Sequence, residues 1–378
     1  MISRLERLVE ELCPGGVEFV SLGNSCHITT GKLDANAQTE NGIYPFFTCN
    51  ENPLKIDTFA FDAEAIIVSG NGSKVGHVNY FKGKFNAYQR TYILMNFENF
   101  DVGFLLHYVK GYLRPYIDKH SKKGSVPYIT MPMLSNFDAP CPPLPIQRKI
   151  VQVLDNFTEL SAELNTELTA RKRQYEYYRG ELLTFGDDVP VVSLGVVAQY
   201  SKARIGTTEL SSDNYVGVDN LLPDKRGKTA SNYVPQSGAH TRFDEGDVLI
   251  GNIRPYLKKI WLADITGGTN GDVLVVHLTK DTVLPRFLYH VLSSDIFFAY
   301  NMQYAKGAKM PRGSKEAIMQ YEIPVPSLEE QERVISVLER FEVLVNDITN
   351  GLPAEIAARQ RQYEYYRDKL LTFKEATS

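Results

Sequence analysis

The sequence RKRQYEYYRGELLTF occupies residues 171–185, and a near copy of it, RQRQYEYYRDKLLTF, occupies residues 359–373. The second copy follows the first by 188 residues, half the length of a chain of 378 residues. A match this long outside low-complexity sequence indicates a tandem duplication. Most of the expected organisation of the protein follows from this duplication.

Weaker matches extend the duplication toward the N-terminus. PCPPLPIQ at 140–147 aligns with PVPSLEEQ at 324–331, and VSLG at 20–23 recurs at 192–195. Between these matches the two halves hardly resemble each other, so each half is predicted to contain a variable globular domain and a more constant helix. The expected segments are an N-terminal helix at 1–16, a first domain at 17–143, a central long helix at 144–186, a second domain at 187–326 and a C-terminal helix at 327–378.

The constant segments have the periodicity of long helices. Apolar residues from Ile146 to Phe185 recur at steps of three and four with one step of seven, and those from Val334 to Phe373 follow the same rhythm. A helix of about 40 residues spans roughly 60 Å. Because an apolar stripe this narrow requires a partner helix, we expect the two helices to pair as an antiparallel coiled coil.

Two details of these helices carry further expectations. The first contains a tetrapeptide rhythm, TEL, SAEL and NTEL, at 158–168, and adding or removing four residues turns a helix by only about 40°. The second contains NGLP at 350–353, where a kink or break is expected. Tyrosines at four positions of the repeat are expected in the seam between the helices, and the remaining tyrosines could face another subunit. The four are Tyr175, Tyr178, Tyr363 and Tyr366.

The globular segments mix strands with helices, which predicts the α+β class. Buried strands that end in tight turns are expected at 65–68 and 247–250, a further strand at 272–278 and a helix at 286–292. The tandem repeat gives the whole chain an expected pseudo-twofold organisation: two α+β domains, each followed by a long helix.

Composition excludes several classes of protein. Cys13, Cys26, Cys49 and Cys141 show neither paired spacing nor a C-x-x-C motif, which fits a reducing cytoplasm and gives no zinc site. No apolar run reaches membrane-spanning length, and the N-terminus is too charged for a signal peptide. The net charge of −4 argues against a simple basic DNA-coating protein.

Catalytic motifs are few. The chain has no P-loop, no H-E-x-x-H, no G-x-S-x-G and no N-P-P-Y or D-P-P-Y of the kind found in amino-methyltransferases. The cluster Gly70-Asn71-Gly72-Ser73-Lys74 could cradle a phosphate on its backbone amides, although such clusters are more often hairpin turns. The seven histidines are scattered, and structural roles are favoured for them.

Two basic stretches occupy equivalent places in the halves. Residues 110–128 carry five cations against Asp118 alone, and residues 302–315 carry four cations and no acid. Each alone would suit a solvated loop, but their recurrence favours contacts with phosphates and base edges. The candidate DNA-contacting residues are Asn71, Ser73, Lys74, Arg90, Arg114, Lys119, Lys122, Lys123, Ser125, Asn252, Arg254, Tyr256, Lys258, Lys306, Lys309 and Arg312.

These motifs together resemble those of the specificity subunits of type I restriction-modification enzymes. The matching elements are the P-x-P-x-L-x-x-Q entry into each helix, the RQYEYYR exit with its L-L-x-F, the strand into GNGSKVG at 70–76 and the opening LCPGGVEF at 12–19. The resemblance spans nearly the whole chain. The helix motifs are highly specific to the family, whereas the domains are too variable to add more.

The resemblance implies a subunit that binds double-stranded DNA without chemistry of its own. Each domain would read one half of a bipartite site, and the helices would set the spacer while docking two adenine methyltransferase subunits. Motor-nuclease subunits would complete the enzyme, with S-adenosylmethionine, ATP and Mg²⁺ on the partners and no cofactor on this chain. Two alternatives remain open from the residues alone: a coiled-coil scaffold that binds only protein, and a nuclease or methyltransferase with an unrecognised site.

Overall fold

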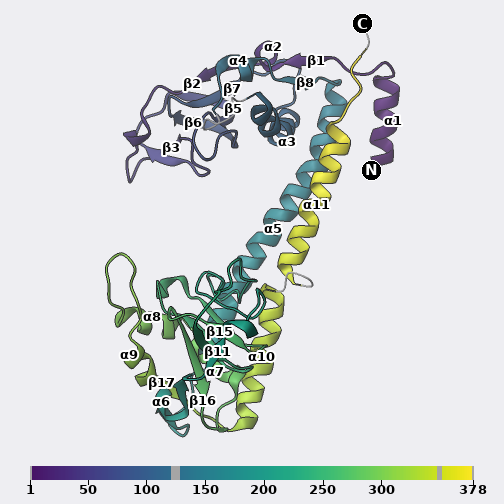
Figure 1. The fold of residues 1–378 in the computed structure, drawn as a ribbon. Helices are drawn as coiled ribbons and strands as arrows, with labels where there is room; N and C mark the ends of the chain where they lie inside the picture. The colour runs from purple at the N-terminus through teal and green to yellow at the C-terminus, as the bar shows by residue number, and fades with distance from the viewer. Residues whose placement is uncertain (1, 121–127, 347–350, 377–378) are drawn as a thin grey trace. The chain divides into compact units, whose positions relative to one another are not determined.

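The computed structural model describes residues 2–120, 128–346 and 351–376, which form two compact units. The first unit comprises Met1–Glu163 and Ala357–Ser378, and the second comprises Leu164–Ile356. Each unit therefore contains one globular domain and segments of two long helices, one from each half of the duplication. Figure 1 shows the elements of both units.

A six-stranded sheet forms the framework of the first unit. Neighbouring strands are antiparallel except β3 and β6, which are parallel. The order across the sheet is β2 (His27–Thr30), β7 (Thr91–Met95), β5 (Phe61–Ser69), β6 (Val78–Ala87), β3 (Tyr44–Phe47) and β4 (Leu54–Ile56).

The second half of the central strand β5, from Ala65 to Ser69, is buried on both faces. Since successive side chains of a strand point to opposite sides, they enter two different cores. Ile66 and Val68 pack into the core beneath helix α3 (Val102–His120), whereas Ala65 and Ile67 pack into a second core with aromatic side chains such as Phe85. The apolar run Ala65–Val68 within this strand follows from that double burial.

Shorter elements complete the first unit. Strands β1 (Phe19–Ser21) and β8 (Asp138–Pro140) pair antiparallel beside the sheet. The remaining elements are α1 (Ile2–Leu12), α2 (Leu22–Ser25), η1 (Ala35–Ala37) and α4 (Met131–Ser135). Gly16 precedes β1 with φ of +98°, and a side chain there would lie 2.6 Å from the carbonyl oxygen of Lys374, so only glycine lets the C-terminal segment pair with Val17.

The second unit has an equivalent but rearranged framework. Its main sheet orders β10 (Ala198–Tyr200), β16 (Val273–Leu278), β13 (Val248–Gly251) and β14 (Ile260–Leu262), all antiparallel. A three-stranded sheet contains β11 (Arg204–Gly206), β12 (Ala239–Phe243) and β15 (Gly267–Thr269), and β9 (Val191–Ser193) pairs with β17 (Glu322–Pro324). The helical elements are α6 (Leu194–Val197), η2 (Thr207–Glu209), η3 (Pro255–Leu257), α7 (Pro285–Leu292), α8 (Asp295–Gln303) and α9 (Lys315–Gln320).

The long helices are α5 (Leu144–Leu182), α10 (Leu328–Asn346) and α11 (Leu352–Leu371), and they pack antiparallel within each unit. In the first unit the Phe157 ring of α5 stacks on Tyr366 of α11, with ring centroids 5.3 Å apart. In the second unit Tyr175 and Tyr178 of α5 stack on Phe341 of α10. The predicted coiled coil is therefore confirmed, with Tyr175, Tyr178 and Tyr366 in its seam, whereas the hydroxyl of Tyr363 contacts His107 of α3.

This arrangement pairs the start of one helix copy with the end of the other. The first domain packs on the beginning of α5 and the end of α11, including Ile150 and Leu371. The second domain packs on the beginning of α10 and the end of α5, including Val334 and Tyr175. Each unit thus uses both halves of the duplicated sequence.

The glutamine of the P-x-P-x-L-x-x-Q motif fixes each helix to its own domain. Gln147 is fully buried; its Nε2 donates to the carbonyls of Pro142 (2.7 Å) and Asn99 (2.9 Å), and its Oε1 accepts from the Asp101 amide (2.7 Å). Gln331 repeats the pattern with the carbonyls of Pro326 and Thr282 and the amide of Leu284, at 2.8–2.9 Å. Because the nitrogen and the oxygen of each buried side-chain amide bond to backbone groups of the adjoining domain, we call this arrangement the glutamine clasp.

The strands expected at 65–68, 247–250 and 272–278 are β5, β13 and β16, and the helix expected at 286–292 is α7. Part of the kink expected at 350–353 falls on residues 347–350, which lie outside the described residues; α10 ends at Asn346 and α11 begins at Leu352. Among the described residues no helix is both long enough and apolar enough to span a bilayer.

Candidate nucleic-acid interface

In the first unit the glycine cluster forms the connection between the paired strands β5 and β6. The Ser69 amide donates to the His77 carbonyl (2.9 Å), and the Gly76 amide donates to the Ser69 carbonyl (2.8 Å). The hairpin interpretation of this cluster is therefore confirmed, because β5 and β6 pair antiparallel on either side of it. Asn71, Ser73 and Lys74 lie at its tip, where Ser73 and Lys74 are exposed.

Two other segments meet this hairpin at Gly70. The Gly70 amide donates to the carbonyl of Arg90 (2.9 Å), and the Ile129 amide donates to the carbonyl of Gly70 (2.8 Å). Arg90 is exposed beside a small pocket of about 250 Å³ that Gly70, Tyr92 and Ile129 also line. The structure thus brings together Arg90 and the hairpin, which are separated in the sequence.

The cations of the first basic stretch are distributed along helix α3 as far as His120. Arg114 donates from Nη1 to the Val75 carbonyl (2.8 Å) and from Nε to Asp118 (3.1 Å), so its guanidinium ties the hairpin to the helix. Lys119 is exposed on the last turn, and Lys74 is paired with Glu51. Lys122, Lys123 and Ser125 lie outside the described residues.

In the second unit the equivalent strand, β13, leads into a strained turn. Asn252 is buried, and Arg254 adopts a left-handed conformation with φ of 52° that few non-glycine residues tolerate. Arg254 is exposed, as is half of the Tyr256 side chain. Lys258 instead donates to Asp295 (2.8 Å), which also accepts from Lys225.

The second basic stretch differs from the first because it is mainly the connection between α8 and α9. Lys306 and Arg312 exchange both backbone hydrogen bonds at 2.9 Å, which closes a small hairpin around Lys309. The Arg254 amide donates to the Pro311 carbonyl (2.7 Å) and docks this hairpin on the β13 turn. Figure 1 shows the loop beside α8 reaching out from the domain.

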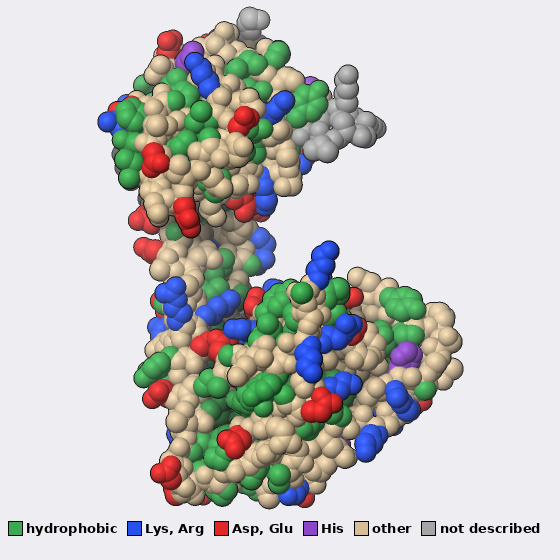
Figure 2. Space-filling view, turned by 90° about the vertical axis from the view of Figure 1, so that its left-hand side faces the viewer, with side chains coloured by type: hydrophobic (Ala, Val, Ile, Leu, Met, Phe, Trp, Pro, Cys, Tyr) green, Lys and Arg blue, Asp and Glu red, His purple; other side chains and the backbone are tan. Residues whose placement is uncertain are grey.

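Candidate residues from two distant segments therefore form one exposed surface, which we call the second basic face: Arg254, Tyr256, Lys306, Lys309 and Arg312. All five side chains are exposed. The view toward the α8 and α9 side shows blue Lys and Arg side chains gathered on this part of the molecule (Figure 2). Such a surface suits contacts with phosphates and base edges.

Sequence reasoning missed two residues that support this face, Asp272 and Asn301, whereas Asn252 was a predicted candidate. Asp272 accepts from the Arg312 guanidinium, and the buried side-chain amides of Asn252 and Asn301 flank Gly313. A side chain at position 313 would lie 2.2 Å from Asn301 Oδ1, which explains the glycine. None of these contacts joins neighbours in the sequence, so no local pattern could have indicated them.

Two equivalent histidines are buried beneath the helices, as structural roles predict. His107 places Nε2 2.9 Å from Asp155 and Nδ1 3.0 Å from the Tyr363 hydroxyl, and its burial lowers its pKa although Asp155 opposes the shift. His290 has no hydrogen-bond partner among the described residues, and burial lowers its pKa to about 3. In the second unit Glu339, which replaces Asp155, pairs instead with Arg286.

The repeated helix motif also leaves one tyrosine exposed in each copy. Tyr177 is 63% exposed and Tyr365 is 62% exposed, and each packs edge-on against its neighbouring seam tyrosine, Tyr178 or Tyr366. Exposed aromatic side chains that recur in the same geometry are typical of a repeated contact surface.

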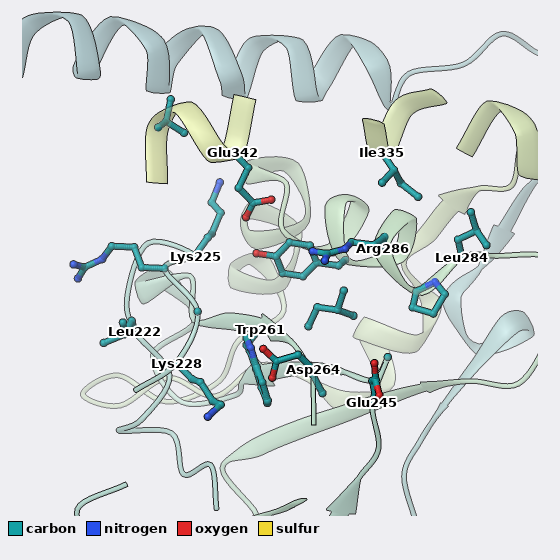
Figure 3. Close-up of a pocket in the computed structure, with 18 of the residues that line it drawn as sticks. Leu222, Lys225, Lys228, Glu245, Trp261, Asp264, Leu284, Arg286, Ile335 and Glu342 are labelled. Carbon is teal, nitrogen blue, oxygen red and sulfur yellow. The ribbon is translucent and has the colours of Figure 1, made fainter. Parts of the chain in front are cut away.

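The second unit further contains a pocket of about 1050 Å³ between its helices and its domain. The α10 side chains Ile335 and Glu342 form one wall, and Trp261 and Leu284 belong to the domain. Figure 3 shows the Glu342 carboxylate directed into the pocket, with the Trp261 ring on the opposite side. Burial raises the pKa of Glu342 against the opposing effect of Arg179 and Arg286. Within the described residues no group of three or more His, Cys, Asp or Glu side chains could hold a metal ion.

Comparison with known proteins places these features in a family. The model of the type I restriction modification DNA specificity domain matches twice, at residues 14–171 and 187–358. The EcoR124I/EcoR124II specificity subunit of Escherichia coli is 32% identical over 257 residues, which are 62% of this chain and 62% of that protein. A type I restriction enzyme specificity subunit of Haemophilus influenzae is 28% identical over 88% of this chain and 89% of its own length.

Solved structures have the same fold at low sequence identity. The specificity subunit of a type I restriction-modification system from M. genitalium is similar with a TM-score of 0.56 at 14% identity, covering 94% of this chain and 96% of that one. A chain from a study of complex assembly in a type I system gives a TM-score of 0.61 at 16% identity, covering 95% and 98%. The chain therefore belongs to the family of type I restriction-modification specificity subunits and carries two target-recognition domains in tandem.

Proposed function

We propose that this chain is the DNA-recognition subunit of a type I restriction-modification complex and that each domain reads one half of a bipartite site. The observation that carries the proposal is the contrast between framework and surface. The two units share the same glutamine clasp and helix seam, down to individual hydrogen bonds. At the end of the equivalent strands β5 and β13, however, they present different polar loops.

Divergent loops on a common framework suit the reading of two different sequences. Phosphate contacts hold a protein on the duplex, and contacts with base edges select the sequence. The second basic face provides both kinds of side chain: Lys309 lies within the hairpin, Lys306 and Arg312 are paired at its base, and Arg254 lies on the turn that holds it. In the first unit Arg90 and the β5–β6 hairpin are the corresponding candidates.

DNA binding is tested by filter binding of the full chain at a series of salt concentrations. The logarithm of affinity should fall linearly with the logarithm of salt, because phosphate contacts release counterions. Lys309→Ala should lower that slope by about 1 and weaken all sequences alike. Lys149→Ala, which removes a partly exposed lysine of α5 that donates to Gln152, is the control and should leave the slope unchanged. A chain without salt-dependent DNA binding would instead be a protein scaffold.

We further propose that two methyltransferase subunits dock on the paired helices, and that motor-nuclease subunits complete the restriction enzyme. S-adenosylmethionine, ATP and Mg²⁺ would bind to those partners. The recurrence of Tyr177 and Tyr365 with equal exposure supports two equivalent docking surfaces. The pocket beside α10 gives the second unit an additional concave apolar surface next to its helices.

Docking is tested by light scattering of the co-expressed complex, which should contain two methyltransferase subunits per chain. Tyr177→Ala and Tyr365→Ala should each reduce the stoichiometry toward one, and the double variant should lose both subunits. A complex that stays at one subunit with saturating partner would contradict the duplicated dock. Incubation of the isolated chain with DNA, Mg²⁺ and S-adenosylmethionine should give neither cleavage nor methylation; product formation would favour an enzyme.

A further inference from the structure

Arg254 and Arg312 lie on adjacent backbones of the second basic face, but their side chains have different surroundings. Ile253 and Arg312 form a bridge, and the Gly313 amide donates to the Asn252 carbonyl (3.1 Å). The Arg254 guanidinium has no ion pair among the described residues. The Arg312 guanidinium, in contrast, is held by Asp272, with Nη2 at 3.1 Å and Nε at 3.3 Å from Oδ1.

Asp272 is itself held in place by the framework. Its amide donates to the side chain of Asn270 (3.1 Å), and its carbonyl accepts from the Asn252 amide (2.8 Å). It immediately precedes β16, which pairs with β13 in the main sheet. The carboxylate therefore fixes the direction of Arg312 relative to the rigid part of the domain.

We propose that Arg312 reads a guanine in the major groove and that Asp272 is its positioning residue. A guanidinium has five N–H groups, and Asp272 uses Nε–H and one N–H of Nη2. The groups left over include one N–H on each terminal nitrogen, the end-on pair that matches O6 and N7 of guanine. The Arg312 side chain is 54% exposed, so this pair is accessible.

The ion pair favours base readout over phosphate contact. A carboxylate about 3 Å from the guanidinium offsets its charge and would repel a phosphate, whereas it leaves hydrogen-bond donors for a neutral base edge. Arg254 lacks such a carboxylate and suits a phosphate. The inference rests on the proposed DNA-recognition function and assigns different roles to two arginines that the sequence left equivalent.

The test is selection of bound sites from a random DNA library by the full chain, its Asp272→Asn, Arg312→Lys and Arg312→Ala variants, and two controls. Glu330→Gln disrupts a comparable exposed ion pair on α10, between Glu330 and Arg333. Arg254→Ala removes the neighbouring arginine, which has no ion pair among the described residues. Thermal melting of each variant checks its folding. If Asp272→Asn fails to fold, Arg312→Lys still tests whether the forked guanidinium is needed for the guanine preference. Salt dependence is measured for each folded variant.

Arg312→Ala should relax a guanine preference at one position by roughly 5- to 150-fold, the range of one bidentate pair. Arg312→Lys should lose most of the same preference because a single ammonium cannot form the fork. Asp272→Asn should weaken the preference at the same position while the salt slope does not fall. Arg254→Ala should lower the salt slope without changing the selected bases, and Glu330→Gln should change neither property.

Uniform weakening of all sequences by Arg312→Ala, with a salt slope lower by about 1, would make Arg312 a phosphate contact and overturn the proposal. A preference altered by Asp272→Asn but not by Arg312→Ala would make Asp272 the reader and would also overturn it, as would unchanged preferences in all variants. If the unmodified chain selects no sequence, the proposed recognition function fails instead, and that result is distinct from the others.

Discussion

Replacing Gln147 or Gln331 with leucine should show how strongly the hydrogen bonds of the clasp, which the two units share, stabilise each unit. Leucine is similar in size and apolar, so it keeps the packing but leaves two carbonyls and one amide without their partner. Each lost hydrogen bond costs about 0.5–1.5 kcal/mol, and buried groups left unpaired add to that cost. We therefore expect each variant to lose roughly 3–5 kcal/mol of the unfolding free energy of its unit.

Glutamate at either position should be worse than leucine. It would place a carboxylate oxygen where Nε2 now donates to two carbonyl oxygens, at 2.7 and 2.9 Å in the first unit. The acceptors would then repel each other in a buried site. The expected order of stability is Gln, Leu, Glu at both positions.

Urea unfolding can assign the loss to one unit because the chain has a single tryptophan, Trp261, which lies in the second unit. Gln331→Leu should move the fluorescence transition to lower urea, whereas Gln147→Leu should move part of the circular dichroism transition and leave the fluorescence midpoint in place. Gln152→Leu, at an exposed position of α5, is the control and should change stability by less than about 0.5 kcal/mol. Losses no larger than that control at both buried positions would refute the clasp.

Three further outcomes are expected. His290→Leu should remove a pH dependence of stability. The pKa of His290 is about 3 in the folded chain and about 6.5 in the unfolded chain, so the unmodified protein keeps its stability above pH 6.5 and loses roughly 1.4 kcal/mol per pH unit below it. Equal slopes in the acid unfolding of the variant and the unmodified protein would contradict this. Phe341→Ala should cost about 3 kcal/mol in thermal or urea unfolding because it removes the ring between Tyr175 and Tyr178, and a loss under 1 kcal/mol would argue against the seam. Deleting residues 161–164 shortens α5 by about 6 Å and turns its distal part by about 40°. Methylome sequencing should then find the same half-sites separated by roughly one or two base pairs fewer. An unchanged spacer would refute the proposal that the length of the helix sets the spacer.

The second basic face shows which features of the site local sequence patterns can predict and which they cannot. The glycine-containing turns after β5 and β13 were predictable because glycine and asparagine mark sharp turns locally. The docking of the Lys306–Arg312 hairpin on the Arg254 turn was not, since it depends on backbone hydrogen bonds between segments more than 50 residues apart. The same limit applies to Asp272, which has no unusual sequence context but determines the surroundings of Arg312.

The two basic stretches illustrate a second limit. They occupy equivalent places in the duplication and have similar composition, yet the first is helical as far as His120 while the second forms a hairpin between α8 and α9. The shared charge could be predicted from composition, but the local backbone conformation depends on packing against the sheet, which differs between the domains. Charge alone therefore predicts a partner better than it predicts the shape that meets it.

The sequence by itself determined the duplication, the long amphipathic helices and their tyrosine seam, because these depend on repetition and on periodicity that neighbouring residues carry. Only the tertiary structure decided that each unit joins the start of one helix copy to the end of the other. The tertiary structure also revealed what the glutamine of the motif does, because the Gln147 side chain donates to carbonyls 5 and 48 residues away in the sequence. Such contacts form only when distant segments fold together, and no local pattern encodes which backbone groups a buried amide will satisfy.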